Sequence, residues 1–234
     1  MSSRQEEKER RRKERQEREQ AEAKRAARRK RMTLAFGGLL GVALIAGIVV
    51  VVLVLGGDDS SSKPTQASEA AANVKLPEQA TSDMAAAAKA AGCTLSNPAY
   101  EGASHEDKQF KPSDYKTNPP TSGNHFPEWY DDGIYNPGDT PELGKLVHTL
   151  EHGRIDVQYA PGTSEDDVAK LEAFLGETDG YHMLLFENTT GMDAALAATA
   201  WGHSLTCSRI DDTTWDALRT FRTSYIDKGP EAVP

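Results

Sequence analysis

Histidine supplies the chemistry that this sequence can most readily carry. The chain has 234 residues and six histidines, and two of these, His148 and His152, lie four residues apart in the string HTLEHG. A separation of four places two side chains on the same face of a helix and also on the same face of a strand, so both structures let the imidazoles converge. On a helix Glu151 would lie beside them, whereas on a strand it would point to the opposite face. Gly153 then allows the backbone to turn into the segment that follows.

Two more histidines precede this pair, in or near a proline-rich stretch. Three or four neutral imidazoles form a ligand set that suits zinc or Cu(II) and does not suit magnesium or calcium. The candidate metal ligands are therefore His105, His125, His148 and His152. The alternative is that these histidines donate to loop carbonyls and stabilise the proline-rich stretch, because buried polar groups find partners.

Other polar residues have supporting roles in this hypothesis. Glu151 or Asp114 could accept the second ring N–H of a ligating histidine and fix its tautomer, so Glu151 would orient a ligand and not bind the ion itself. His182 and His203 lie in runs that resemble strands, where a structural role is the default interpretation.

The string from His148 to His152 also has the form HxxEH of the inverted zinc peptidases, in which both histidines bind zinc and the glutamate activates water. Glu151 would be catalytic only in such a hydrolase. That class needs a further acidic ligand in a helical context, and here a strand beginning near Gly153 is expected instead. The sequence therefore disfavours this interpretation, and no other catalytic residue is predicted.

Only two cysteines are present, Cys93 and Cys207. In an oxidising compartment, two thiols of one domain most often pair, and we expect a disulfide here. Two buried or free thiols are the alternative, because spacing alone does not show that the two Cα atoms meet.

The first 57 residues predict a membrane anchor. Residues 1–31 hold fourteen basic and seven acidic residues, and residues 32–57 are an uncharged run rich in Val, Leu, Ile, Gly and Ala. A run of this length spans a bilayer as a helix, and the basic flank places the N-terminus in the cytoplasm. Residues 1–31 thus form a cytoplasmic charged segment that sets topology or contacts anionic inner-leaflet lipids. The rest of the protein would then face outward.

The remaining sequence predicts a linker followed by one domain. Residues 58–80 are polar and lack periodic apolar residues, which indicates a flexible linker, and residues 81–234 would form the extracytoplasmic domain. Since the chain has a net charge of −9 and residues 1–31 carry +7, the part beyond them carries −16. Such an acidic surface disfavours binding to nucleic acid.

Alternating and helical patterns in this domain predict an α+β fold with an antiparallel or mixed sheet. Strands are expected at 154–159 and 181–187, with a third within 194–207, and the first of these should be half buried. Helices are expected from about 81 to 92, from 163 or 164 to 176, and from 213 to 227. Six prolines between residues 110 and 144 exclude a long regular element and predict a loop that wraps over the body.

Several blocks of this sequence resemble a known family. They are NPPTSGNH at 118–125, GIY at 133–135, LVHTLEHG at 146–153, TAWG at 199–202 and a terminal Pro230–Glu231. Together with His105 they are similar to the bacterial domain of unknown function 3105, over about residues 93–234. The resemblance implies a membrane-anchored envelope protein, mainly of actinobacteria, without an agreed activity. His203 is not among the motif histidines.

Three functional hypotheses follow. The first is a tethered extracytoplasmic domain that binds copper or zinc through histidine, for storage, sensing or delivery. The second is a non-enzymatic structural or adaptor domain that contacts another envelope protein. The third is a metal-dependent hydrolase that uses the HxxEH string. Metal content separates the first hypothesis from the second.

Overall fold

The computed structural model describes residues 63–231, all of which belong to one unit formed by residues 58–234. The predicted charged segment at 1–31 and the predicted membrane helix at 32–57 lie outside the described residues. Within residues 63–231, no helix combines the length and the apolar character that a membrane crossing requires.

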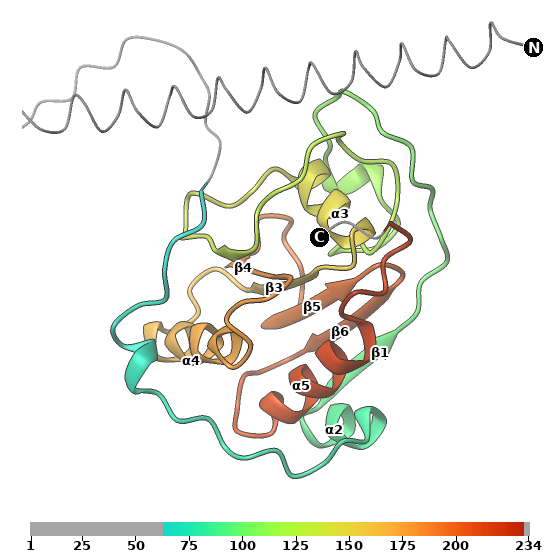
Figure 1. Ribbon diagram of the computed structural model, residues 1–234. Coiled ribbons are helices and arrows are strands. Elements are labelled where there is room, and N and C mark those ends of the chain that lie inside the picture. The colour runs from blue at the N-terminus through green and yellow to red at the C-terminus, as the bar shows by residue number, and fades with distance from the viewer. Residues whose placement is uncertain (1–62, 232–234) are drawn as a thin grey trace, which may run out of the picture. The chain divides into compact units, whose positions relative to one another are not determined.

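A six-stranded mixed sheet forms the centre of the domain (Figure 1). Its strand order is β1-β6-β5-β3-β4-β2. The β3–β4 and β4–β2 pairs are parallel, and the β3–β5, β5–β6 and β6–β1 pairs are antiparallel. The strands are β1 (Cys93–Ser96), β2 (Gly133–Ile134), β3 (Ile155–Tyr159), β4 (Met183–Glu187), β5 (Leu196–Ala200) and β6 (His203–Cys207). Within residues 63–231, the sheet and four α-helices make the α+β fold that the sequence predicts.

Three of the helices share one core with the sheet. Helices α2 (Met84–Ala90), α4 (Glu165–Gly176) and α5 (Thr214–Tyr225) place their apolar side chains in a cluster with residues of β3, β4, β5 and β6. Side-chain caps begin two of these helices, because Asp83 accepts from the Ala86 N–H and Ser164 from the Asp167 N–H. These caps satisfy amide groups that lack a partner inside the helix.

Helix α3 (Leu143–Glu151) and the proline-rich stretch belong to two other clusters. Leu146 of α3 packs with Leu184 and Phe186 of β4, and Val147 of α3 packs with Phe110 and Tyr115. Between Phe110 and Glu142 the regular elements are the short 3-10 helix η2 (Pro112–Asp114) and β2. The many prolines account for this irregular backbone.

Two strand expectations need correction. All five residues of β3 are buried, including Asp156 and Gln158. The strand was expected to be half buried, but it is central in the sheet. Both helix α3 and the main core pack against it. The stretch from 194 to 207 forms the hairpin β5–β6, not one strand, and its turn contains Gly202 at φ +74°.

Residues 63–80, predicted to be a flexible linker, contact the domain. Thr65 bridges Ile134 of β2, the Ser68 N–H donates to Glu172 of α4, and a 3-10 helix η1 (Ala71–Asn73) follows. Further along, Arg219 of α5 donates to the Pro77 carbonyl. Such contacts place this stretch against the domain, which differs from the predicted boundary near residue 81.

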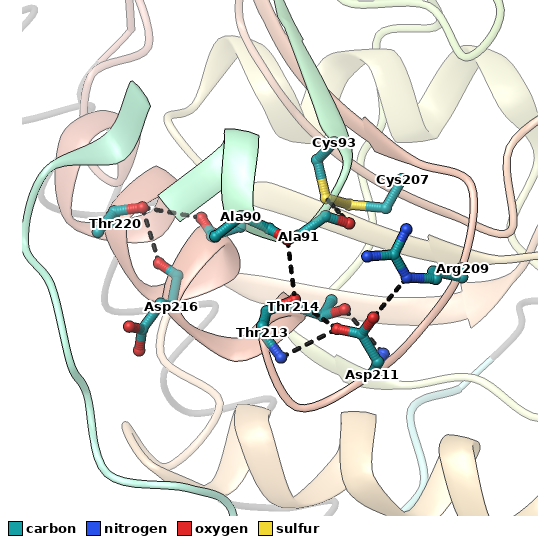
Figure 2. Close-up of a disulfide and its surroundings, with 11 residues drawn as sticks. Ala90, Ala91, Cys93, Cys207, Arg209, Asp211, Thr213, Thr214, Asp216 and Thr220 are labelled. Atoms are coloured by element: carbon teal, nitrogen blue, oxygen red, sulfur yellow. Dashed lines mark hydrogen bonds and ion pairs between the residues drawn. A yellow bond between two sulfur atoms is a disulfide. The ribbon is translucent and has the colours of Figure 1, made fainter. Parts of the chain in front are cut away.

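Cys93 and Cys207 form the expected disulfide, which joins β1 to β6 across 114 residues of sequence. The two residues are direct partners in the antiparallel β1–β6 ladder, with their Cα atoms 4.1 Å apart. Figure 2 shows the bond beside Ala90 and Ala91, at the end of α2, and near the turn that holds Arg209 and Asp211. The disulfide therefore links the beginning of the domain to its last strand.

Candidate metal centre

The HxxEH string lies on α3 and its C-cap, so His148 and His152 are about one helical turn apart and point to the same side. Helix α3 ends at Glu151, His152 is its C-cap, and Gly153 adopts φ +81°, a value that glycine adopts without strain. The rings of His148 and His152 have centroids 4.4 Å apart. The apolar side chains of Leu146, Val147 and Leu150 are buried, as are both histidines.

The remaining two predicted ligands reach α3 from the preceding irregular stretch. His105 and His125 form an isolated parallel β-bridge. Their ring centroids lie 4.8 Å apart, and the His148 ring is 4.6 Å from His105 and 4.7 Å from His125. Three imidazoles from three distant positions of the sequence therefore meet at one point.

Glu151 completes this cluster, which we call the Glu151 group: His105, His125, His148 and Glu151. The carboxylate oxygen Oε2 of Glu151 lies 2.9 Å from Nε2 of His125, 3.5 Å from Nε2 of His105 and 4.0 Å from Nε2 of His148. One ligand atom from each residue lies within 4.8 Å of every other. All members except His105 are buried.

Backbone carbonyls orient two of the three rings. Nδ1 of His125 is 2.8 Å from the Gly123 oxygen, and Nδ1 of His148 is 2.8 Å from the Phe126 oxygen. Because a carbonyl only accepts hydrogen bonds, Nδ1 must carry the proton in both rings. Each Nε2 of the neutral ring therefore presents a lone pair toward Glu151. Among the described residues, neither Nε2 of His125 nor Oε2 of Glu151 has a hydrogen-bond partner.

Burial also favours the protonation state in which histidine binds metals. Desolvation lowers the pKa of His125 and of His148, and the neighbouring histidines add to the effect. Burial lowers the pKa of His152 to about 4. These rings are therefore neutral at pH 7, as metal ligation requires. Burial raises the pKa of Glu151, since its carboxylate has lost water.

A second cluster adjoins the first, and we call it the Glu231 group: His148, His152 and Glu231. Its ligand atoms also lie within 4.8 Å of one another. Nε2 of His152 is 3.6 Å from Oε2 of Glu231, and the Glu231 N–H donates to the carbonyl oxygen of Glu151. The exposed ring of Trp129 contacts His152 edge to face, with centroids 4.6 Å apart.

All four predicted metal ligands thus lie in these two groups, and so does Glu151. It was expected to accept a second ring N–H, and this task falls to the carbonyls of Gly123 and Phe126, while Glu151 faces the Nε2 atoms. Asp114, the other candidate for that role, accepts from the backbone N–H of Lys111.

The two histidines assigned structural roles lie outside both groups. Nδ1 of His182 is 2.6 Å from Asp227, and Nδ1 of His203 is 2.6 Å from Asn97. Each ring also stacks on a tyrosine, Tyr181 and Tyr225 respectively.

Sequence reasoning missed Glu231 and Trp129 as neighbours of the histidines. Pro230–Glu231 was among the blocks of the family resemblance, so that resemblance contained a signal for Glu231. Glu231 is far from α3 in the sequence, so local patterns could not predict its contact with His152. No spacing rule would have related Trp129 to His152, because the irregular backbone between them determines how close they come.

A family model described as "Protein of unknown function (DUF3105)" matches residues 106–233. The chain belongs to this family. The DUF3105 match includes every member of the two groups except His105, which immediately precedes it. No curated protein and no solved structure matches the chain.

Proposed function

We propose that this protein binds a transition metal ion, copper or zinc, in an extracytoplasmic domain tethered to the membrane by residues 32–57. The observation that carries the proposal is the convergence of three Nε2 atoms and one carboxylate oxygen in the Glu151 group. Neutral imidazoles with a carboxylate suit zinc or Cu(II).

The short contact between His125 and Glu151 supports a cation at this point. Both atoms are electron-rich when Nδ1 carries the ring proton, yet they lie 2.9 Å apart. A proton or a metal ion between them removes the repulsion. One proton can be shared by only two of these atoms, whereas a metal ion can bind all four ligand atoms at once. The arrangement of four ligand atoms therefore favours a metal ion.

The distances also fit an ion of the proposed kind. Zinc binds imidazole nitrogen and carboxylate oxygen at about 2.0–2.2 Å, which places the ligand atoms of a tetrahedral site about 3.3 Å apart. The separations of 2.9, 3.5 and 4.0 Å around Glu151 lie near this value. Small side-chain adjustments would complete the site.

The hydrolase hypothesis gains little from this geometry. In the inverted peptidase string the glutamate activates water beside the metal. Here Glu151 lies among the Nε2 atoms as a ligand would, and β3 follows Gly153 directly after the helix. The arrangement therefore favours holding an ion over cleaving a bond.

Two features support the proposed location. The uncharged run at 32–57 is long enough to span a bilayer, and its basic flank favours an outward domain. The Cys93–Cys207 disulfide suits an oxidising compartment outside the cytoplasm.

The test measures metal in the purified full-length chain after loading with copper or zinc and removal of the excess. We expect about one equivalent of metal for the wild type, as for a single mononuclear site. His125→Asn/His148→Asn should reduce the retained metal at least tenfold, because it leaves one imidazole and one carboxylate in each group, while the two amides can still donate to the Gly123 and Phe126 carbonyls.

The matched control is His182→Asn, which removes another buried histidine outside both groups. Asparagine tolerates the positive φ at this position, and its metal content should equal that of the wild type. A wild type that retains neither metal, and whose thermal unfolding does not shift when either is added, would favour the structural or adaptor hypothesis.

A further inference from the structure

The Glu231 group has properties of an ion site in its own right. His152 is buried, and its Nδ1 has no hydrogen-bond partner among the described residues. Buried polar atoms are rarely left without a partner. Its Nε2 faces Glu231, and His148 supplies a third ligand atom within 4.8 Å. Two imidazoles and a carboxylate form a set of three ligands that suits the same metals as the Glu151 group.

His148 belongs to both groups, but it offers only one free nitrogen. Its Nδ1 donates to the Phe126 carbonyl, so Nε2 is the atom available to an ion. The single lone pair of Nε2 binds one ion at a time. Consequently the two groups cannot both use His148 in the same molecule.

The two groups also reach solvent through different residues. In the Glu151 group the exposed ligand is His105, with 42% of its side chain accessible. In the Glu231 group it is Glu231, with 50% accessible. The shared His148 lies between them and is buried. An ion that moves from one group to the other can therefore enter beside one exposed ligand and leave beside the other.

We propose that the protein holds its ion in either of two alternative positions, the Glu151 group and the Glu231 group, and transfers it between them through His148. This inference rests on the proposed function and adds to it a route by which the bound ion is transferred. A chain built in this way suits delivery of an ion better than permanent storage.

Copper(II) is the probe for the test, with the full-length chain and electron paramagnetic resonance to count coordinated nitrogens. The wild type should bind one copper ion, with a three-nitrogen signal and a two-nitrogen signal. His105→Asn/His125→Asn should retain its copper and show only the two-nitrogen signal, since only the Glu231 group still offers two imidazoles and a carboxylate. Adding Glu231→Gln to this double variant should reduce copper at least tenfold, because neither group then offers two imidazoles and a carboxylate.

Glu231→Gln alone provides a measurement that does not depend on a buried substitution, because this side chain is half exposed. It should retain one copper ion and lose the two-nitrogen signal. His182→Asn is again the matched control, and its spectrum should equal that of the wild type.

Three results would overturn the inference. They are a His105→Asn/His125→Asn variant that is folded by near-ultraviolet circular dichroism but binds no copper, a wild type that binds two copper ions, and a wild-type spectrum that Glu231→Gln leaves unchanged. A wild type that binds no metal would instead overturn the proposed function, so the two failures are distinct.

Discussion

The two nitrogens of an imidazole have separate tasks in this site. For His125 and His148, Nδ1 donates to a carbonyl of the irregular stretch, and Nε2 faces Glu151. The sequence offered metal binding and carbonyl bonding as alternatives for these histidines. The rings bond to carbonyls through Nδ1, and their Nε2 atoms remain available to bind a metal. Outer partners of this kind commonly fix the tautomer of metal-binding histidines.

Asp156 gives a prediction at the scale of one residue. It is buried in β3 and accepts from the Thr149 hydroxyl at 3.0 Å. Burial raises the pKa of this carboxyl well above its usual range, and Thr149 and Arg154 offset only part of the rise. The native state therefore holds the proton more tightly than the unfolded state, so stability is lost as the pH rises through the native pKa.

We expect Asp156→Asn to be more stable than the wild type at pH 8 and to lose this advantage toward pH 5. One proton changes the free energy of unfolding by at most about 1.4 kcal/mol per pH unit. Chemical denaturation at several pH values measures the difference. Asp139→Asn, at an exposed position, should follow the wild type, and a parallel pH dependence for Asp156→Asn would contradict the expectation.

At the scale of elements, the end of α3 is fixed by the chain that returns to it. A Cβ atom on Gly229 would lie 2.1 Å from the Glu151 oxygen and 2.3 Å from the Gly153 nitrogen. The final segment, which carries Glu231, thus packs directly on the backbone of the helix terminus, and Figure 1 shows the chain returning to α3.

Gly229→Ala should therefore displace this segment and reduce the free energy of unfolding by about 1–3 kcal/mol, the usual cost of overpacking. Gly176→Ala is the control, because a Cβ there meets no atom within 4 Å and alanine favours the helix. Denaturant unfolding of both variants tests the packing. Equal stability of Gly229→Ala and the wild type would show that the segment yields without cost.

The elements differ in how well the sequence predicts them. The helices that contain Leu171 and Trp215 were predicted from the helical spacing of their apolar residues, since this signal is local. Strands β1 and β2 were missed because they have four and two residues, too few to show a pattern. The strand order depends on contacts between distant segments, and local periodicity contains no record of them.

The candidate site shows the same division. The spacing of His148 and His152 predicts their convergence on either a helix or a strand, so this part of the site could be predicted from the sequence. His105 and His125 entered the ligand set by residue type alone. The position of Glu151 among the nitrogens depends on the backbone between Gly123 and Phe126, which no periodicity describes.

At the scale of the whole molecule, the disulfide connects β1, early in the folded domain, to β6, its last strand. It closes a loop of 114 residues, and the chain-entropy account gives about 4–5 kcal/mol of stabilisation for a loop of this length. We expect the double variant Cys93→Ala/Cys207→Ala to lose up to this amount in denaturant unfolding. The wild type with a thiol reductant should approach the variant, and full stability of the double variant would contradict the prediction.

The carbonyl bonds to His125 and His148 have a consequence for the kinetics of ion capture. Immobilising a flexible side chain upon association costs about 0.5–1.5 kcal/mol. In this protein the two rings are already held by the fold, so the chain meets that entropic cost before any ion arrives. Capture would then be limited by the shedding of water from the incoming cation and by its diffusion to the surface, with no slow rearrangement of the polypeptide.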